Sequence, residues 1–395
     1  DVERSRGLGD VYKRQGHTVD MITSDRTKGA GGAWSVRLVD GIRVHACSVP
    51  YDNRMSYSRR IRAFFDFALR VRGYLGSLRA DVVFATSTPL TIALPAVAMA
   101  RRWGVPMVFE VRDLWPALPI AMGALRFPGS RWAARRLERW AYRNAQHVVA
   151  LSPGMREGVL ATGVLSAERV SIAPNSCDLD LFDPSRPEKD AVDARRTLGL
   201  PDGPLVVYAG TLGHINGVTY LVEVARACVT AGKDVRFVVL GDGVEADRLR
   251  HVARSAGVLG THFFLFGSQP KTVVAKVLRE ANVCCSLFID LPAMRANSAN
   301  KFFDALAAGR PVAVNYGGWH AELVREERVG LVWPADNPEG AARALMAAME
   351  SPAELVAMGD RARALAEQRF ARDALAAQVL GCLLYTSDAA DERSS

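Results

Sequence analysis

The stretch Arg295–Gly318, RANSANKFFDALAAGRPVAVNYGG, contains a predicted helix followed by a short buried strand. Asn297 and Ser298 are good N-cap residues, so we expect the helix to begin there. Gly309 ends the helix, a proline two residues later prevents its continuation, and Val312–Asn315 follows as the strand. A helix and a buried strand in this order are typical of an α/β domain.

The predicted helix also carries polar groups near its start. Asn300 and Asp304 are four residues apart and therefore share one face. The free N–H groups and positive dipole end of a helix start suit a phosphate, and Lys301 adds a full charge. Asp304, one turn deeper, is placed to accept hydrogen bonds from a ribose diol. The stretch therefore indicates a site for a pyrophosphate and its sugar, with an ordinary capped helix as the alternative.

Apolar runs of strand length alternate with helical stretches along the rest of the chain. The strand candidates in the first half are Ile42–Cys47, Val82–Ala85, Met107–Glu110, His147–Leu151 and Val170–Ala173. Those in the second half are Leu205–Ala209, Val235–Leu240, Phe263–Phe266, Val283–Leu287 and Val312–Asn315. The alternation predicts repeated βαβ units, and therefore a parallel sheet in each half.

The two ends of the chain do not fit this alternation. Gly16 and His17 precede what is predicted as a strand, but neither the residues before Gly16 nor those after Gly381 continue the pattern. Both ends are similar to translated adapter sequence from metagenomic assemblies, so we interpret them as non-native and expect little contribution to the fold. The expected organisation is a non-native start 1–15, a first domain 16–183, a proline-rich linker 184–204, a second domain 205–370, a terminal helix 371–381 and a non-native tail 382–395.

The composition is that of a globular protein with unevenly distributed charge. The chain has 395 residues, of which 49% are hydrophobic and 23% charged, and its length favours two domains. The net charge is +8 at pH 7, and the excess lies in the first half. Such an excess suits nucleic acid, an anionic membrane or a phosphate-bearing substrate, of which we favour the last two. The six cysteines lack metal or redox spacing, which suits a reducing cytoplasm, and we expect neither a metal nor a cofactor.

Three loops that contain glycine follow predicted strands. Ala209–Gly217 opens the second half and precedes a helix, and it is followed along the chain by Leu240–Gly243 and Phe266–Gln269. Glycine lets the backbone approach a ligand closely, so the first loop is a candidate binding loop. A plain tight turn is the alternative interpretation of that loop.

Arg295–Gly318 and the loop Ala209–Gly217 resemble the donor-binding segments of retaining glycosyltransferases of family 4. The likeness is strongest to a bacterial surface-polysaccharide branch, the N-acetyl-fucosaminyltransferase-like enzymes, and covers about Gly16–Gly381. In the wider family two glutamates stand eight positions apart; the second corresponds to Asp304, whereas the first falls on Ala296. The resemblance implies two Rossmann-like α/β domains that face a cleft, the GT-B type, with the first strand of the N-terminal domain missing.

The resemblance also implies a nucleotide-sugar donor site on the second domain. The pyrophosphate would be held by backbone N–H groups, Lys301 and His214, and the ribose by Asp304. Leu240–Gly243 would line the nucleotide, and Phe266–Gln269 would hold a uracil through its backbone. The implied donor-binding residues are Gly210, Thr211, Gly213, His214, Asn216, Gly241, Gly243, Gly267, Lys301 and Asp304, with Asn297, Ser298 and Asn300 in place of the missing glutamate.

The implied reaction is transfer of a sugar, an N-acetylated hexosamine in our interpretation, from a UDP-sugar with retention at the anomeric carbon. The implied acceptor is a polyprenyl-diphosphate-linked saccharide of bacterial surface polysaccharide synthesis, such as O-antigen or capsule. The enzyme would be a cytoplasmic protein, peripheral on the inner face of the plasma membrane.

Two segments of the first domain are candidates for the acceptor side. Asp113 follows the strand at Met107, and by resemblance it faces the donor and orients the acceptor hydroxyl or the sugar. Arg112 is the second catalytic candidate, with a structural ion pair as an equal alternative. Thr86–Pro89 is a helix-start signal that would bind an acceptor phosphate or, as we favour, only cap a helix.

Two basic stretches of the first domain, Tyr57–Leu78 and Ser130–Asn144, are predicted amphipathic helices. Each combines apolar or aromatic residues at helical spacing with several arginines, and in the first stretch the apolar stripe consists of Ile61, Phe64, Phe65, Ala68 and Leu75. Basic amphipathic helices bind anionic membranes, which is the interpretation we favour because the resemblance implies a lipid-linked acceptor. A core stripe with a solvated charged face is the alternative.

Two other functions remain open from the sequence. A UDP-sugar epimerase uses a similar architecture, but it needs acid and base groups beside the sugar carbon that we do not identify. The residue Ala296, where the wider family has a glutamate, keeps open a catalytically inactive sugar-nucleotide-binding subunit.

Overall fold

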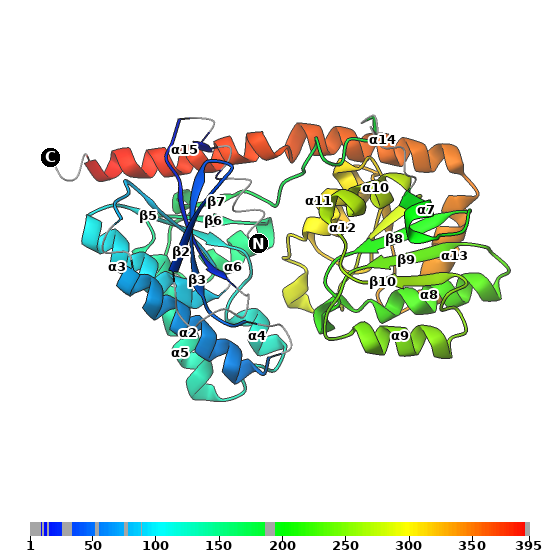
Figure 1. The fold of residues 1–395 in the computed structure, drawn as a ribbon, viewed down its shortest axis with the longest axis horizontal. Helices are drawn as coiled ribbons and strands as arrows, with labels where there is room; N and C mark the ends of the chain where they lie inside the picture. Colours follow the sequence, from blue (N-terminus) through cyan, green and yellow to red (C-terminus); the bar gives the residue numbers. More distant parts are fainter. Residues whose placement is uncertain are drawn as a thin grey trace. The chain divides into compact units, whose positions relative to one another are not determined.

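The computed structural model divides into two compact units, 1–174 together with 372–395, and 175–371. The described residues are Gly9, Tyr12, Lys13, 16–25, 34–51, 55–74, 78–87, 89–185 and 194–391. Most of residues 1–15, linker residues 186–193 and Thr88 therefore lie outside the described part of the chain. Each unit is an α/β domain built on parallel strands (Figure 1). The predicted fold class, two Rossmann-like domains with parallel sheets, is confirmed.

The first unit has a four-stranded parallel sheet at its centre. Its strands are β4 (Val83–Thr86), β5 (Met107–Val111), β6 (His147–Ala150) and β7 (Val170–Ile172), in the order β4-β5-β6-β7. Every residue of β5 is buried, because helices cover both faces of a parallel sheet. This explains why the sequence of β5 does not alternate between apolar and polar residues, as the sequence of a half-exposed strand does.

A second, three-stranded sheet in this unit joins β1 (Asp20–Asp25), β3 (Ile42–Ser48) and β2 (Trp34–Val39). β1 pairs with β3 in parallel, whereas β2 and β3 form an antiparallel hairpin. Our sequence prediction left β2 out. The signal was present, since Asp40 and Gly41 join two strands as a two-residue turn with positive φ angles of 51° and 76°.

The remaining elements of the first unit are helical. They are α2 (Tyr57–Tyr74), η2 (Leu90–Ile92), α3 (Ala93–Trp103), α4 (Ala117–Ala121), α5 (Pro128–Asn144), α6 (Pro153–Leu160), η3 (Ala167–Arg169) and α15 (Arg372–Asp391). The C-terminal helix α15 contacts β5 and β6. Tyr12 and Leu383, from the two end segments, are buried in one cluster with Val108 and Val149. These two side chains thus belong to the core of the first unit.

The second unit contains a six-stranded parallel sheet. Its order is β10 (Phe263–Phe266), β9 (Arg236–Leu240), β8 (Leu205–Ala209), β11 (Val283–Ser286), β12 (Val312–Val314) and β13 (Gly330–Val332). Numbered within the unit, this is the Rossmann order 3-2-1-4-5-6, so the direction of winding reverses between β8 and β11. The short strand β13 was not predicted. Ligands of such sheets bind beyond the carboxyl ends of the strands at this reversal.

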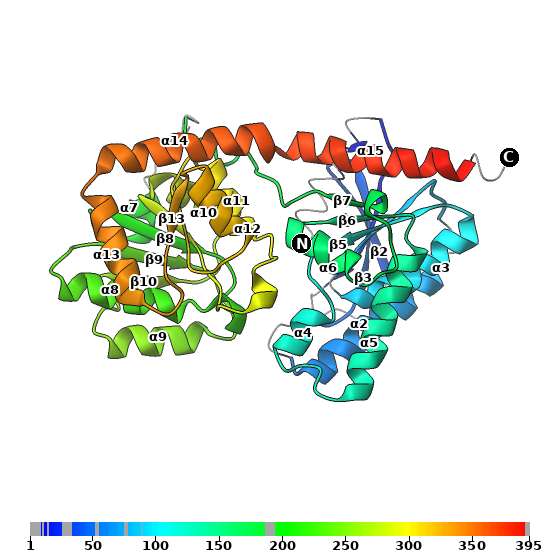
Figure 2. The ribbon, with the colours of Figure 1, turned by 180° about the vertical axis from the view of Figure 1, so that it is seen from behind.

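Helices cover both faces of the second sheet, with α8 and α9 on one side and α10 and α11 on the other (Figures 1 and 2). The helices are α7 (Ala194–Leu198), η4 (His214–Asn216), α8 (Thr219–Thr230), α9 (Ala246–Ser255), α10 (Lys271–Glu280), η5 (Pro292–Met294), α11 (Asn300–Ala307), α12 (Trp319–Glu326), α13 (Pro338–Met349) and α14 (Pro352–Arg369). None of the helices in the described part of the chain has the length and apolar character of a membrane span.

Candidate functional site

The loops after β8 and β9 lie against each other at the carboxyl edge of the second sheet. The Gly210 amide donates to the Leu240 carbonyl over 2.9 Å. A Cβ atom on Gly241 would lie 1.9 Å from the Gly210 carbonyl oxygen, and one on Gly243 would lie 2.3 Å from the Leu212 carbonyl oxygen. Both distances are far below van der Waals contact, so only glycine fits at these two positions. The glycines therefore allow two loop backbones to line one edge together.

The loop after β8 is fixed by its own side chains. The Asn216 side-chain oxygen accepts a hydrogen bond from the Gly213 amide over 3.2 Å, and Asn216 is 7% exposed. The Tyr208 hydroxyl donates to the Thr211 carbonyl over 2.9 Å. Thr211 itself is exposed. Asn216, a predicted donor-binding residue, thus has a contact that shapes the loop.

His214, a predicted phosphate contact, is paired with a carboxylate. Its Nδ1 lies 2.6 Å from one Glu245 oxygen, and Arg248 lies 3.1 Å from the other. His214 is 64% exposed by side chain, whereas Glu245 is 16% exposed. The ring therefore contacts a carboxylate at the edge of the loop, and the same carboxylate also pairs with an arginine.

The helix of the opening stretch begins later than predicted. α11 starts at Asn300, its N-cap is Ala299, and no side chain caps it. Asn297 and Ser298 are not its caps, since the N-cap position is Ala299, and their side chains make other contacts. The Ser298 hydroxyl accepts from the Asn175 amide over 3.1 Å, and the Asn297 amide group donates to the Met294 carbonyl. Both residues instead hold the segment that leads into the helix.

Lys301 has the most informative environment at this edge. Its amine lies 4.0 Å from the centre of the Phe288 ring and 5.0 Å from that of Tyr208, and it donates to the Tyr208 hydroxyl over 3.3 Å. No carboxylate lies within 4.0 Å of this amine among the described residues. Burial lowers the pKa of Lys301 to about 7. The site thus encloses a cationic group between two aromatic rings without a protein counter-ion.

This amine lies at the crossover of the sheet. Phe288 follows β11, Tyr208 belongs to β8, and a Cβ on Gly210 would lie 3.7 Å from the Lys301 side chain. These are the two strands between which the winding reverses. Lys301 and Gly210 were predicted from the sequence as site residues, whereas Phe288 and Tyr208 were not. The only signal in the sequence was their position, since Tyr208 is next to the last residue of one predicted strand and Phe288 directly follows another.

Behind the amine lies a buried histidine that the sequence analysis also missed. The His320 ring stacks on Phe302 with 4.0 Å between ring centres. Its Nδ1 is 2.9 Å from the Tyr316 hydroxyl, which is also 3.1 Å from the Ser286 hydroxyl. Burial, together with the Lys301 charge, lowers the pKa of His320 to about 3. The neutral imidazole thus supports the wall of the site and adds no charge to it.

Asp304 is half-buried one turn into α11, as its position in the sequence predicted. Burial, and then the Asp304 charge, raises the pKa of the Cys177 thiol, whose sulfur donates to the Phe303 carbonyl over 3.2 Å. Asn300 is exposed at the first turn. Asp304 therefore lies in α11 close enough to Cys177, near the start of the second unit, for its charge to act on the thiol.

At the carboxyl edge of the first sheet, hydroxyl groups connect β4 and β5. The Thr86 hydroxyl donates to the buried Glu110 carboxylate over 2.7 Å, and the Ser87 hydroxyl accepts from the Arg112 amide over 3.0 Å. The segment Thr86–Pro89 does lead into a helical turn, since Pro89 is the N-cap of η2, but no side-chain hydrogen bond caps that turn. Glu110 was not predicted from the sequence as part of this edge. Arg112 and Asp113 follow β5 directly.

Two family descriptions match the two halves of the chain. Residues 3–176 match the glycosyl transferase 4-like domain, and residues 203–351 match the glycosyl transferases group 1. The chain is 28% identical over 328 residues to a GDP-mannose-dependent alpha-mannosyltransferase of Mycobacterium tuberculosis, covering 83% of this chain and 78% of that protein. It is 26% identical to a 2-deoxystreptamine glucosyltransferase of Streptomyces kanamyceticus, where the match covers 56% of each chain.

Solved structures show the same fold. Sucrose-phosphate synthase from Thermosynechococcus elongatus superposes with a TM-score of 0.77 at 21% identity, covering 98% of this chain and 93% of that one. Anabaena HepE in complex with UDP-glucose superposes with a TM-score of 0.67 at 16% identity, covering 93% and 100%. Residues 3–176 are therefore matched as a glycosyl transferase 4-like domain and residues 203–351 as a group 1 glycosyl transferase domain, and the fold is that of the GT-B glycosyltransferases.

Proposed function

We propose that this chain is a retaining glycosyltransferase that moves a sugar from a UDP-sugar to a lipid-linked saccharide in bacterial surface polysaccharide synthesis. The observation that carries the donor class is Lys301, whose half-buried side chain places its amine against two aromatic rings, without a carboxylate partner in the described residues, at the crossover of a Rossmann sheet. A buried charge is costly unless it is paired, and the diphosphate of a nucleotide-sugar supplies the missing anion. We propose an N-acetylated hexosamine as the transferred sugar.

In this proposal the second unit binds the donor. Backbone amides of the loop after β8 and the Lys301 amine contact the diphosphate, and Asp304 accepts hydrogen bonds from the ribose. The loop that contains Gly267 is exposed after β10 and contacts the uracil through its backbone. The donor-binding role is supported by the complex of a structurally similar protein with UDP-glucose.

The chemistry in this proposal depends on stabilising the leaving group. As the bond between the anomeric carbon and the phosphate oxygen breaks, negative charge grows on UDP. In this proposal Lys301 and the loop amides face that charge and stabilise it without rearrangement. Asp113, at the carboxyl edge of the first sheet, orients the acceptor hydroxyl, and Arg112 is held beside it through the contact of its amide with Ser87.

Asp304→Ala should lower UDP affinity about ten- to a hundredfold while the fold survives. The hydrogen bonds lost from a carboxylate to the ribose are worth roughly 1.5–3 kcal/mol. Calorimetric titration with UDP checks this, and circular dichroism checks the fold. An affinity equal to that of the unmodified protein would remove Asp304 from the ribose site.

The membrane part of the proposal rests on α2. Ile61, Phe65 and Leu69 are four residues apart, and they are 40%, 45% and 68% exposed. They form an apolar ridge on a basic helix, whereas the buried side of α2 carries Ala68 and Val71. An exposed apolar ridge beside arginines suits insertion at an anionic membrane surface.

Replacing Ile61, Phe65 and Leu69 with asparagine should reduce sedimentation with phosphatidylglycerol vesicles at least tenfold, because the ridge loses its buried apolar area. Reversing Arg59, Arg60 and Arg62 to glutamate should weaken binding mainly at low salt. The protein should not sediment with neutral phosphatidylcholine vesicles. Equal binding to both vesicle types would count against the membrane role.

The experiment that tests the transfer itself is donor profiling with a polyprenyl-diphosphate-linked acceptor, followed by mass spectrometry. A panel of UDP-N-acetylhexosamines, UDP-hexoses and GDP-mannose distinguishes a preference for the donor sugar from a preference for the nucleotide base. Transfer from a UDP-N-acetylhexosamine supports the proposal in full. Transfer from GDP-mannose alone would overturn the choice of base, and turnover of no donor would overturn transferase activity.

A further inference from the structure

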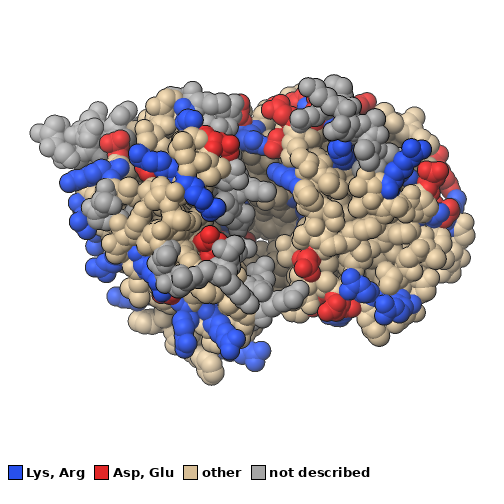
Figure 3. All heavy atoms as spheres, in the orientation of Figure 1, with Lys and Arg blue, Asp and Glu red and all other residues tan. Residues whose placement is uncertain are grey.

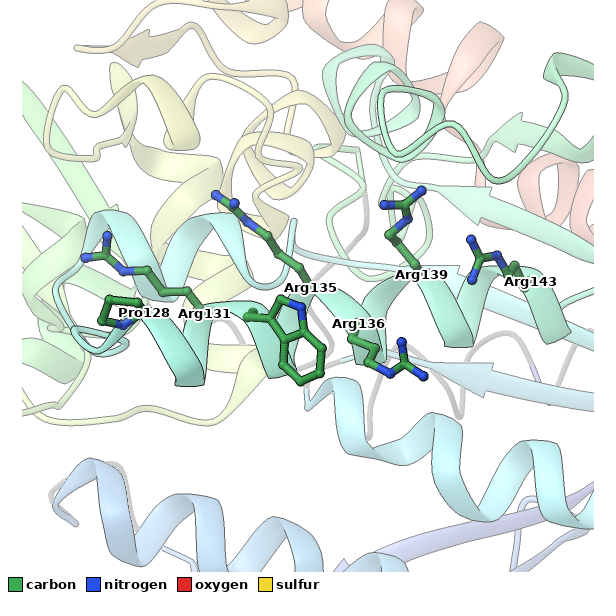
Figure 4. Close-up of a pocket in the computed structure, with 7 residues that line it drawn as sticks. Pro128, Arg131, Arg135, Arg136, Arg139 and Arg143 are labelled. Carbon is green, nitrogen blue, oxygen red and sulfur yellow. The ribbon is translucent and has the colours of Figure 1, made fainter.

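Helix α5 carries a row of arginines that the proposed donor chemistry does not use. Arg131, Arg135, Arg139 and Arg143 are four residues apart and follow one another along the helix, whereas Arg136 points to another side (Figure 4). With a rise of about 1.5 Å per residue, successive arginines of this set are about 6 Å apart along the helix axis, and the set spans about 18 Å. We define these four residues as the arginine row.

Within the described residues the positive charge of the row is offset only in part, by Glu138, whose carboxylate interacts electrostatically with Arg135 and Arg139. Arg135, Arg139 and Arg143 are exposed, and no carboxylate lies within 4.0 Å of any of them there. Glu138, the one acidic residue on α5, is half-buried and accepts from the Tyr142 hydroxyl over 3.4 Å. Figure 3 shows several Lys or Arg side chains at the end of the first unit where Figure 1 places α2 and α5. The row is therefore open to an external anion.

An aromatic ring and a proline lie beside the row. Trp132 is 66% exposed, and the Arg136 guanidinium lies 5.7 Å from the centre of its ring. Pro128, Trp132 and the arginines line one groove. A flat indole face accepts the apolar face of a sugar ring, and guanidinium groups bind carboxylates or phosphates in a bidentate manner. The groove combines both kinds of contact.

The position of α5 in the fold determines which end of the arginine row lies nearer to Asp113. α5 follows α4, which comes after the segment Arg112–Asp113 at the carboxyl end of β5, and it returns the chain to the start of β6. The row thus starts near the edge that carries Asp113 and leads away from it. A linear acceptor whose reacting end is at Asp113 can place its earlier sugar units along α5.

We propose that the arginine row binds the already assembled part of an anionic acceptor, a linear saccharide that carries carboxylates or phosphates along its length. This inference rests on the proposed glycosyltransferase function and specifies its acceptor class. A membrane is the less suitable occupant of α5, because the exposed apolar side chains, Phe127 and Trp132, are confined to the start of the row. The apolar ridge of α2 is where a membrane would gain apolar contact.

The test uses the full chain and two soluble probes of equal length, hexagalacturonate and neutral maltohexaose, in calorimetric titrations at low salt. The unmodified protein should bind hexagalacturonate and not maltohexaose. Arg135→Gln with Arg139→Gln should weaken binding about tenfold, as two charge contacts are lost. Arg59→Gln with Arg62→Gln on α2 removes the same charge from another basic helix and should change affinity less than twofold.

The outcomes separate the possible explanations. Equal weakening by both double variants shows a nonspecific effect of net charge and overturns the proposal, as does equal affinity for the two probes. Loss of phosphatidylglycerol vesicle binding in the α5 variant, with hexagalacturonate binding unchanged, assigns the row to the membrane and also overturns it. UDP titration of the same samples reports on the donor site of the second unit alone, so a failure of the proposed function is distinguished from a failure of this inference.

Discussion

Lys301→Met is expected to lower UDP affinity about a hundredfold at pH 7 while the folded protein keeps or gains thermal stability. The amine is enclosed by Phe288 and Tyr208 without a protein counter-ion in the described chain, so it costs stability in the free protein and contributes when a diphosphate is bound. A charge-assisted contact with a phosphate is worth roughly 1.5–3 kcal/mol, up to about a hundredfold in affinity. Calorimetric titration with UDP and thermal denaturation measure both effects.

The matched control is Lys233→Met, which removes an exposed lysine that pairs with Glu350 on the surface of the same unit. This variant should bind UDP within twofold of the unmodified protein. A Lys301→Met protein that binds UDP normally would show that the amine does not face the donor. A Lys301→Met protein that loses stability and affinity together would assign Lys301 a structural role.

Gly241→Ala should destabilise the second unit by about 3 kcal/mol and abolish measurable UDP binding. The new Cβ would lie 1.9 Å from the Gly210 carbonyl oxygen, so one of the two loops must move. Overpacking of this kind costs about 1–3 kcal/mol or more, and here the displaced atoms are backbone. Thermal denaturation followed by UDP titration below the transition measures both losses.

Gly260→Ala is the control for this variant. Gly260 has a φ of +80° but no heavy atom within 4 Å of the Cβ position, so the substitution carries the backbone strain without the clash. It should cost about 1–2 kcal/mol and leave UDP affinity unchanged. Equal losses in both variants would show that backbone strain alone accounts for the effect of Gly241→Ala.

The strands were predictable because most of them belong to parallel sheets that are buried on both faces. Such strands are continuous apolar runs between helical patterns, and β5 and β8 are buried throughout or nearly so. β2 and β13 lack this property, since β2 has exposed positions and β13 has three half-buried residues. Apolar runs therefore identified the strands of the parallel sheets, including the edge strands β4, β7 and β10, but missed the edge strands β2 and β13.

The start of α11 was mispredicted for a tertiary reason. Asn297 and Ser298 have the chemistry of N-caps, but Ser298 bonds to Asn175, which is 123 residues away in sequence. No local pattern contains that partner. The same limit applies to Lys301, whose position was predicted but whose aromatic enclosure comes from Phe288 and Tyr208 on two other segments.

Helical periodicity likewise did not decide which apolar residues of α2 are exposed. Ile61 and Phe65 were in the predicted apolar stripe and are exposed, whereas Ala68 from the same stripe is buried. Both outcomes fit one helical repeat, because the repeat fixes the spacing and the packing partner fixes the buried face. The exposed apolar ridge of α2 could therefore be identified only from the structure.

The central claim is that the Lys301 amine faces the diphosphate of the donor, and proton uptake on UDP binding tests it most directly. The pKa of Lys301 is about 7 in the free protein, and a bound diphosphate raises it by favouring the charged form. Above pH 7 the free amine is mostly neutral, so binding must take up a proton, and UDP affinity must fall as pH rises.

Calorimetry at pH 8 in buffers of different ionisation enthalpy measures this uptake. This pH lies well above the second phosphate pKa of about 6, so the nucleotide contributes little. We expect uptake of up to one proton per UDP in the unmodified protein and none in Lys301→Met. UDP binding without proton uptake, and with an affinity independent of pH between 7 and 9, would contradict the account.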